Sequence, residues 1–428
     1  MSATDPHPRT LAETQAGIVD SDPASWLPIE RARAIISGFI EPVTLVEHVP
    51  IRTALTRVLA QDVLSTIDVP PHDNSAMDGY ALRADDLADA APTRLRIAGT
   101  AFAGRGFEGE LAPGQALRIM TGAPMPRGAD TVVIQESVRV EGNEVIVPVG
   151  QIRGQHCRER GEDLRAGEPA LPGGKRLGPA DIGLLASLGV PEVGVRRRLR
   201  VAFFSTGDEL CPVGQTPGPG QIYDSNRYTI WSMLTRLGVE VVDLGIVRDS
   251  PQALEEAVRT AAAEADAIIS SGGVSVGEAD FTRDVMARLG DVAFWRIALR
   301  PGRPMAFGRI GRASYFGLPG NPVAVMVTFY FIVRDALLQM MGAASQPLPW
   351  VRARTLEGMR KRPGRTEYQR AHLQIGSDRR MQVRPIGNQG SGVLRSMAQA
   401  NCIVVLHHDQ GPVQTGDEVD CIAFEGLL

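Results

Sequence analysis

Residues 270–280 read Ser-Ser-Gly-Gly-Val-Ser-Val-Gly-Glu-Ala-Asp and stand between the apolar run 267–269 and a helical pattern at 281–289. A strand that ends at two glycines, here Gly272 and Gly273, and then enters a helix is typical of an anion site. Glycine allows close backbone approach, and free N–H groups face the ligand. Hydroxyls and carboxylates lie in the same stretch, on Ser270, Ser271, Ser275, Glu278 and Asp280. They indicate a phosphate ester held with a divalent metal. Taken alone, the stretch fits a plain glycine turn with a helix cap equally well.

The chain around this stretch alternates between strand and helix patterns. Expected strands lie at 201–204, 239–244, 267–269 and 292–295, and residues 251–265 place their apolar side chains on one face of a helix. This alternation predicts a doubly wound, mainly parallel sheet that is covered on both sides. Residues 323–341, which follow Pro322, are interpreted as a buried core helix.

The flanking regions have a different pattern. Short strands separated by glycine and proline at 95–147 predict a small all-β domain, and two rigid polar loops, 68–80 and 120–126, belong to this region. Residues 44–60 predict a strand followed by a helix. Beyond residue 347 the pattern returns to β and predicts a small C-terminal barrel or sandwich.

The sequence therefore predicts an α/β plus β, multidomain chain. Its expected parts are a disordered N-terminus (1–22), a helical and glycine-rich linker domain in two pieces (23–48 and 154–198), a β-rich domain with the Asp78 and Thr121 loops (49–153), an α/β domain (199–343) and a C-terminal β-barrel (344–428).

Composition narrows the function classes. The 428 residues have a formal net charge of −4 and a pI near 6.0, which argues against nucleic acid as a partner. Of the 45 basic residues, all but Lys175 and Lys361 are arginine. The four cysteines are widely spaced and too few for a disulfide scaffold, and the seven histidines form no zinc pattern. No signal peptide is visible, and the apolar run 323–333 is too short to span a membrane. We expect a cytoplasmic, reduced protein.

Several loops are expected to meet at one edge of the sheet, because ligands of open α/β sheets bind at the carboxyl ends of the strands. These loops are 205–209, 248–251, 270–280, 300–303 and 317–322, and residues 223–226, before the second helix, are expected at their rim. They would place carboxylates opposite arginines, namely Glu209, Asp249 and Asp280 opposite Arg296, Arg300 and Arg303. Such carboxylates suit Mg²⁺, and arginines beside glycine N–H groups suit an oxyanion. Each acid alone also fits a helix cap, and Arg296 also fits a surface charge beside Trp295.

Five motifs in this order resemble the MoeA family of molybdopterin molybdenumtransferases and the related E domain of gephyrin-type proteins. They lie at 73–81 (Asp-Asn-Ser-Ala-Met-Asp-Gly-Tyr-Ala), 118–124, 204–210, 270–280 and 317–323. The resemblance spans about residues 25–425. It implies an elongated homodimer, with four domains per subunit, that binds adenylated molybdopterin, inserts molybdate, releases AMP and requires Mg²⁺. It also implies a cleft between the α/β domain of one subunit and the Asp78/Thr121 domain of the other.

The functional positions of the family fall on Asp78, Thr121, Asp163, Glu209, Asp249, Asp280, Pro319, Pro322, Arg370 and Ser391. Roles are hypothesised from chemistry. Asp249 and Asp280 hold Mg²⁺, whereas Glu209, Asp78 and Thr121 position the pterin end or a reactive water. Arg296 and Arg300 bind molybdate, and Arg303 binds the phosphate region. The glycine loop completes substrate binding through Ser271, Gly272, Gly273 and Ser275.

One departure and two alternatives accompany the resemblance. Family members usually have lysine at positions 296, 300 and 303. Arginine keeps the positive charge but differs in geometry, and we expect it to retain oxyanion binding. One alternative is the adenylation of molybdopterin by ATP, which would give the Asp78 and Thr121 loops no role. The other is a non-enzymatic scaffold that binds a loop of a partner. The molybdopterin adenylyltransferase is also left open as a binding partner.

Overall fold

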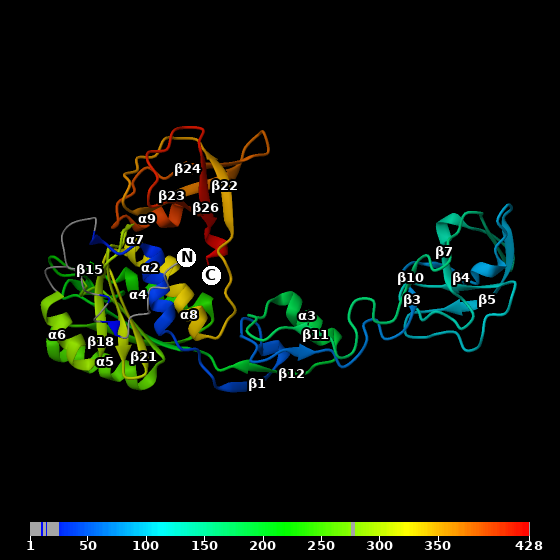
Figure 1. Cartoon of the computed structure of the whole chain (residues 1–428), viewed down its shortest axis with the longest axis horizontal. Helices are drawn as coiled ribbons and strands as arrows, with labels where there is room; N and C mark the ends of the chain where they lie inside the picture. Colours follow the sequence, from blue (N-terminus) through cyan, green and yellow to red (C-terminus); the bar gives the residue numbers. More distant parts are fainter. Residues whose placement is uncertain (1–9, 12–13, 15–24, 275–278, 428) are drawn as a thin grey trace, which may run out of the picture.

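The computed structural model describes residues 10, 11, 14, 25–274 and 279–427. Figure 1 shows an elongated molecule. The α/β domain and the C-terminal barrel pack together at one end, a linker follows, and a small β-domain forms the far end. The predicted multidomain α/β plus β class is confirmed. The residue boundaries of the domains and the disorder of the N-terminus stay predictions. In the N-terminal part, the described residue Leu11 is buried in the core of the α/β domain.

The α/β domain is built on a six-stranded sheet. In spatial order its strands are β16 (Glu240–Val247), β13 (Arg200–Thr206), β17 (Ala267–Ser271), β21 (Ala313–Leu318), β20 (Pro304–Ile310) and β18 (Asp291–Arg296). The first four are parallel, and β20 runs antiparallel to both of its neighbours. The sheet is thus mainly parallel, as predicted. The hairpin of β20 and β21 was not predicted, because both strands are buried and show no alternation of polar residues.

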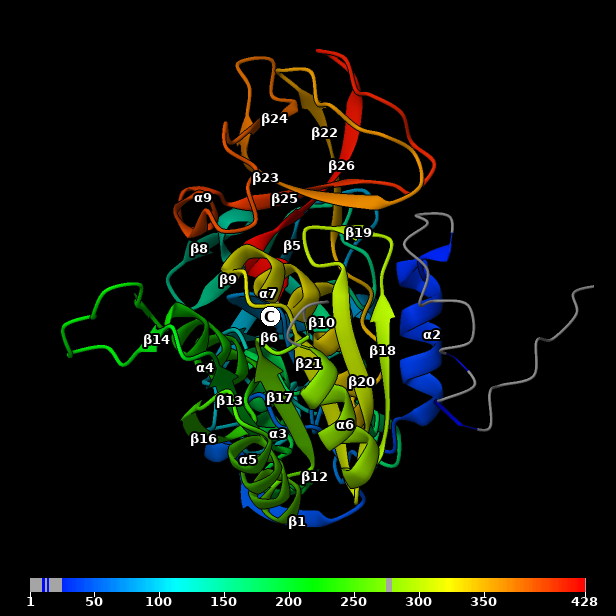
Figure 2. The same cartoon turned by 90° about the vertical axis from the view of Figure 1, so that its left-hand side faces the viewer.

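Helices cover both faces of this sheet (Figure 2). On one face lie α5 (Pro251–Glu264) and α6 (Ala279–Leu289); on the other lie α2 (Ile29–Phe39), α4 (Ser225–Leu237), α7 (Pro322–Thr328) and α8 (Arg334–Met340). Strand β13 serves both faces, because Phe204 packs toward α5 and Phe203 toward α4. Both phenylalanines are fully buried, and each burial contributes about 1.5–3 kcal/mol.

A single helix runs from Pro322 to Met340, with a π-helical turn (Phe329–Val333) between α7 and α8. Its 19 residues are long and apolar enough to cross a membrane by length and composition, but 83% of the apolar window is buried inside the protein. Phe329 and Leu337 are fully buried in the core. Within the described ranges, this is the one helix with such a composition, and its burial agrees with the predicted core helix.

The β-domain contains a second six-stranded sheet. Its spatial order is β7 (Thr131–Ile134), β4 (Gly79–Leu82), β6 (Gln115–Ile119), β5 (Thr93–Ala101), β9 (Glu144–Val147) and β8 (Arg139–Glu141). Two passes of the chain form a neck between this domain and the linker (Figure 1). In the neck, Asp68 accepts a hydrogen bond from the Ala166 N–H at 2.9 Å and pairs with Arg160, which ties the two passes together.

The linker contains two short antiparallel strand pairs and one helix. These elements are β1 (Val46–Pro50) with β12 (Glu192–Arg196), β2 (Val63–Leu64) with β11 (Pro169–Leu171), and α3 (Pro179–Ser187). The helix predicted within 44–60 is wrong, because only a 3₁₀ turn forms at Ile51–Thr53. Thr56 then takes a left-handed φ of 66°, and its N–H donates to Leu177. Hydrogen bonds to the other half of the linker therefore replace the hydrogen bonds of a helix here.

The C-terminal domain is a closed barrel, as predicted. Its strands pair in the order β23 (Thr366–Ile375), β24 (Met381–Pro385), β22 (Trp350–Thr355), β26 (Glu418–Ala423) and β25 (Cys402–Leu406), and β25 pairs back with β23. A short strand of the α/β domain, β19 (Leu299–Arg300), also pairs with β23 and fastens the barrel to that domain. The helix α9 (Leu394–Gln399) lies beside the same junction.

Candidate active site

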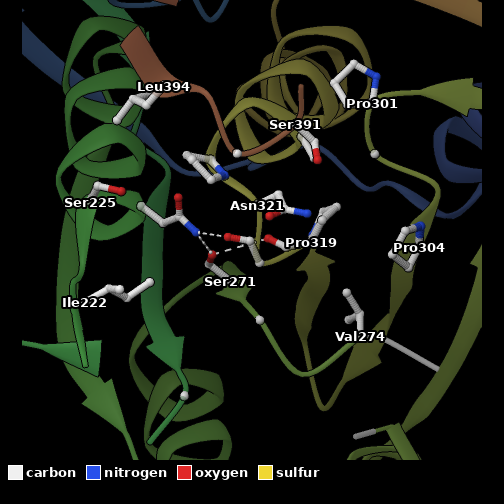
Figure 3. A pocket seen from close by; sticks show the side chains of 18 of the residues that line it. Ile222, Ser225, Ser271, Val274, Pro301, Pro304, Pro319, Asn321, Ser391 and Leu394 are labelled. Atoms are coloured by element: carbon white, nitrogen blue, oxygen red, sulfur yellow. Dashed lines mark hydrogen bonds between the residues drawn. The ribbon is translucent and has the colours of Figure 1, made fainter. Parts of the chain in front are cut away.

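A cavity of about 980 Å³ opens at the carboxyl ends of β13 and β17. From β13 the chain passes through α4 to β16 on one side, and β17 pairs with β13 on the other side. The carboxyl ends of β13 and β17 therefore flank the point where the strand order reverses, which is where open α/β sheets bind their ligands. Figure 3 shows side chains from separate segments, among them Ser271, Pro319, Asn321 and Ser391, around this cavity.

Many of the residues predicted from sequence line this one cavity. They are Glu209, Asp249, Ser271, Gly272, Gly273, Arg300, Arg303, Pro319, Pro322 and Ser391. Asp280 lies in the first turn of α6, but its side chain is outside the described part of the chain, as is Ser275. Arg296 ends β18 and is not among the described residues that line the cavity. Whether each residue binds substrate stays a prediction.

The glycine loop has a backbone that requires glycine. Gly272 has a φ of 96°, and a Cβ atom there would lie 2.5 Å from the carbonyl oxygen of Thr206. Gly273 follows with a φ of 69°. Both values lie in the left-handed region, which residues with a Cβ rarely adopt. The loop therefore brings bare backbone to the cavity wall, as an anion site requires.

Two arginines supply positive charge at the cavity. Arg300 lies 3.6 Å from Glu367, a barrel residue that is 2% exposed, and Glu367 also pairs with Arg365 at 2.9 Å. The guanidinium of Arg303 stacks on Trp26 at 4.4 Å from the ring centroid, and burial lowers its pKa from the usual value. The Trp26 ring thus holds Arg303, which lines the cavity, without neutralising its charge.

Two carboxylates, Glu209 and Asp249, also line the cavity and are exposed. Over residues 10–11, 14, 25–274 and 279–427, no three His, Cys, Asp or Glu residues are grouped closely enough to hold a metal ion. Mg²⁺ needs no such group, because it binds through one or two carboxylates together with substrate phosphates and waters. A pair of accessible carboxylates beside an anion loop therefore fits Mg²⁺.

The barrel contributes the loop 389–392 to the cavity, and Arg370 holds this loop from below. Arg370 is 1% exposed and donates to the carbonyls of Asn388 (3.3 Å) and Gly390 (3.0 Å) and to the Ser396 hydroxyl (3.0 Å). Burial lowers its pKa to about 10, so it keeps its charge at neutral pH. Arg370 thus supports the cavity wall rather than lining it.

Two further residues support this wall, and sequence reasoning missed one of them, Gln389. Gln389 accepts from the Arg370 N–H at 3.0 Å and donates to the Arg370 carbonyl at 2.9 Å, which fixes the barrel loop. Asn226 donates to Ser271 at 2.9 Å and to the Gly320 carbonyl at 2.6 Å. Asn226, the second residue of α4, lies in the stretch 223–226 that was predicted to form the rim. The signal that could have found Gln389 is its place two residues before Ser391.

Three predicted residues lie away from this cavity: Asp78 and Thr121 belong to the β-domain at the far end of the molecule, and Asp163 belongs to the neck (Figure 1). Asp78 accepts two hydrogen bonds from Thr121, one from its N–H and one from its hydroxyl, both at 2.7 Å. These bonds, the backbone one first, lower the pKa of Asp78. Asp163 is exposed, and its N–H donates to the carbonyl of Val69 in the neck. A single chain therefore does not bring all the predicted residues together.

Comparisons with known proteins agree along the whole chain. The MoeA N-terminal region (domain I and II) matches residues 27–189, a probable molybdopterin binding domain matches 202–339, and the MoeA C-terminal region (domain IV) matches 352–424. A molybdopterin molybdenumtransferase of Haemophilus influenzae is 40% identical over 404 residues, which cover 94% of this chain and 100% of that protein. One from Nostoc sp. is 39% identical over 87% of each.

Solved structures give the same result. The molybdopterin biosynthesis moeA protein from Pyrococcus horikoshii OT3 superposes with a TM-score of 0.81 at 28% identity, covering 93% of this chain and 100% of that one. A second structure of a moeA protein from this archaeon has a TM-score of 0.74 at 32% identity, covering 94% and 100%. This chain belongs to the MoeA family of molybdopterin molybdenumtransferases.

Proposed function

We propose that this chain inserts molybdate into adenylated molybdopterin, releases AMP and thereby forms molybdenum cofactor. The observation that carries the proposal is the convergence, in one cavity, of the glycine loop with two carboxylates and two arginines. The family is an enzyme family of molybdenum-cofactor biosynthesis, so the substrates of this chain belong to that pathway.

The backbone and arginine donors suit the anionic parts of both substrates. The Gly272 N–H already donates to the Leu318 carbonyl at 3.1 Å, so the N–H of Gly273 would donate to a phosphate oxygen, and Arg303 would bind beside it. Arg300, with Arg296, would bind molybdate. Glu209 would position the pterin end. Because Glu367 already compensates part of the charge of Arg300, we expect Arg300 to bind a second anion less tightly than Arg303 binds the phosphates.

Cleavage of the phosphoanhydride bond leaves negative charge on the departing AMP oxygen. Fixed donors around that oxygen lower the barrier, because they are arranged before the charge develops. We propose that Asp249 and Asp280 hold Mg²⁺, which would neutralise charge on the phosphates. Asp249 and Gly272 line the same cavity, as such a role requires.

We further propose that the active enzyme is a cytoplasmic homodimer. The polar loops of Asp78 and Thr121 lie too far from the cavity of their own chain to act there (Figure 1). In a homodimer, the β-domain of one subunit would close the cavity of the other, and Asp78 would then position the pterin end or a reactive water. The adenylyltransferase and scaffold alternatives are not favoured, since the family match includes both the N-terminal and C-terminal regions.

The test is to mix the protein with adenylated molybdopterin and molybdate and to identify the released nucleotide by mass spectrometry. We expect AMP, released only when molybdate is present. Asp249→Asn should lower the rate about 100-fold or more, because it removes charge at the phosphates. Glu255→Gln is the matched control: it removes a carboxylate that pairs with Arg259 and Arg288 on α5 and α6, away from the cavity. Release of ATP or no nucleotide by the wild type would refute the proposal.

A further inference from the structure

Asn226 connects three segments that are far apart in sequence. It is the second residue of α4, 45 positions from Ser271 and 94 positions from Gly320. Its amide nitrogen lies 2.6 Å from the Gly320 carbonyl and 2.9 Å from the Ser271 hydroxyl. A carbonyl oxygen only accepts hydrogen bonds, so the nitrogen must face Gly320, and the same nitrogen then donates to Ser271.

This bond decides what the Ser271 hydroxyl offers to a ligand. A hydroxyl has one proton to donate, and Asn226 does not use it because Asn226 is itself the donor. The other partner, the Pro319 carbonyl, is 3.4 Å away, which is long for an O–H···O bond. Ser271 ends β17, is 2% exposed and lines the cavity directly before Gly272 (Figure 3). Its proton is therefore weakly engaged at the wall where an anion is expected.

The oxygen atom of the Asn226 amide supports a role for this residue beyond packing. Its Oδ1 atom is buried and has no hydrogen-bond partner among the described residues. A buried polar atom without a partner is unfavourable for folding, and such atoms in native proteins concentrate where function requires the arrangement. The described contacts of Asn226 thus satisfy the amide nitrogen and leave the oxygen unsatisfied.

We propose that Asn226 is a positioning residue that makes the Ser271 hydroxyl a hydrogen-bond donor to the anionic part of the substrate. This inference rests on the proposed function, since it assumes that the substrate presents phosphate or molybdate oxygens to the glycine loop. Asn226 itself would act through Ser271 and through the turn at Gly320.

The test is a double-mutant cycle with Asn226→Ala and Ser271→Ala, in which anaerobic calorimetry measures binding of adenylated molybdopterin. Each single variant should bind about tenfold more weakly, as expected for loss of one bond to a charged ligand. Because both act through one hydroxyl, the double variant should also lose about tenfold rather than about 100-fold. Additive losses would overturn the proposal.

A second variant separates positioning from packing. Asn226→Asp keeps the shape of the side chain but reverses the hydrogen bond, since a carboxylate would accept the Ser271 proton. It should weaken binding more than N226A, whereas equal or smaller loss would contradict the proposal. Asn401→Ala is the control, because the Asn401 amide likewise makes two hydrogen bonds, both to the backbone of Leu373 in the barrel, away from the cavity. N401A should bind as the wild type does. Failure of the wild type to bind would overturn the proposed function itself.

Discussion

The cavity of the α/β domain and the Asp78 loop of the β-domain are both made of rigid polar loops, but they differ in what completes them. Around the cavity, loops from several strands and from the barrel meet within one chain. The Asp78 loop is held by bonds within its own domain, since Asp78 accepts two hydrogen bonds from Thr121. Rigid polar loops therefore surround a cavity at one end of the molecule and stand apart from it at the other. Under the proposed function the Asp78 loop is a half-site that a second subunit completes, and the following experiments test this difference.

The largest effect is expected when the two regions are inactivated in separate subunits. Asp78→Ala and Asp249→Asn should each reduce AMP release about 100-fold or more. When the two inactive proteins are mixed and exchange subunits, about a quarter of the wild-type activity should return, because half of the dimers are mixed and each has one intact cleft. Subunit exchange is verified with two affinity tags. Mixed dimers without recovered activity would show that each chain builds its site alone.

A substitution in the glycine loop should damage the cavity alone. Gly272→Ala forces a Cβ atom to within 2.5 Å of the Thr206 carbonyl at a φ of 96°, so we expect a stability loss of about 1–3 kcal/mol and weaker adenylate binding. Gly142→Ala is the control in the β-domain: its φ is 62°, but nothing lies within 4 Å of the new atom. It should cost only about 1–2 kcal/mol and leave binding unchanged. Thermal unfolding and calorimetry distinguish the two variants.

The charge at the cavity should matter for molybdate more than for the adenylate. Arg300→Ala should raise the molybdate concentration needed for half-maximal AMP release about tenfold, with a smaller effect on adenylate binding. Arg300→Lys should restore most of the response, because the charge beside Glu367 is kept. Equal losses for both substrates would assign Arg300 to the phosphate region instead.

The smallest effect concerns the half-site itself. Thr121→Ala removes the hydroxyl bond to Asp78 and keeps the backbone bond, which is the larger cause of the lowered pKa. The pKa of Asp78 should therefore rise toward its usual value without reaching it, which NMR titration of the Asp78 carboxyl would follow. The hydroxyl bond favours the ionised form of Asp78. Its stabilising contribution is therefore fully present at neutral pH and is lost as the pH falls through the lowered pKa. An unchanged pKa would mean that the hydroxyl does not hold Asp78.

Local patterns were sufficient for much of the fold. Residues 251–265 predict a helix that the structure places at Pro251–Glu264, and the run 267–269 lies within β17. The glycine loop was recognisable because the need for glycine is a property of its own backbone. These predictions depend on neighbours in sequence, so one sequence contains the necessary information.

Other parts depend on contacts between distant residues and could not be predicted in this way. Nothing near Arg370 in the sequence indicates that it would hold the loop at Gly390 against the α/β domain. The role of Asn226 depends on partners 45 and 94 positions away. The helix expected within 44–60 failed for the same reason, since its N–H groups bond to the other half of the linker.

The neck at Asp68 is the narrow connection between the β-domain and the rest of the molecule. Two passes of the chain connect the β-domain to the linker, and the hydrogen bonds of the Asp68 carboxylate to Ala166 and Arg160 join these passes. A bend confined to the neck would move the β-domain as one body and leave the cavity walls unchanged, because no described residue that lines the cavity belongs to the β-domain or the neck. Such a bend would require no repacking of either core, because the α/β domain and the β-domain have separate clusters of buried residues.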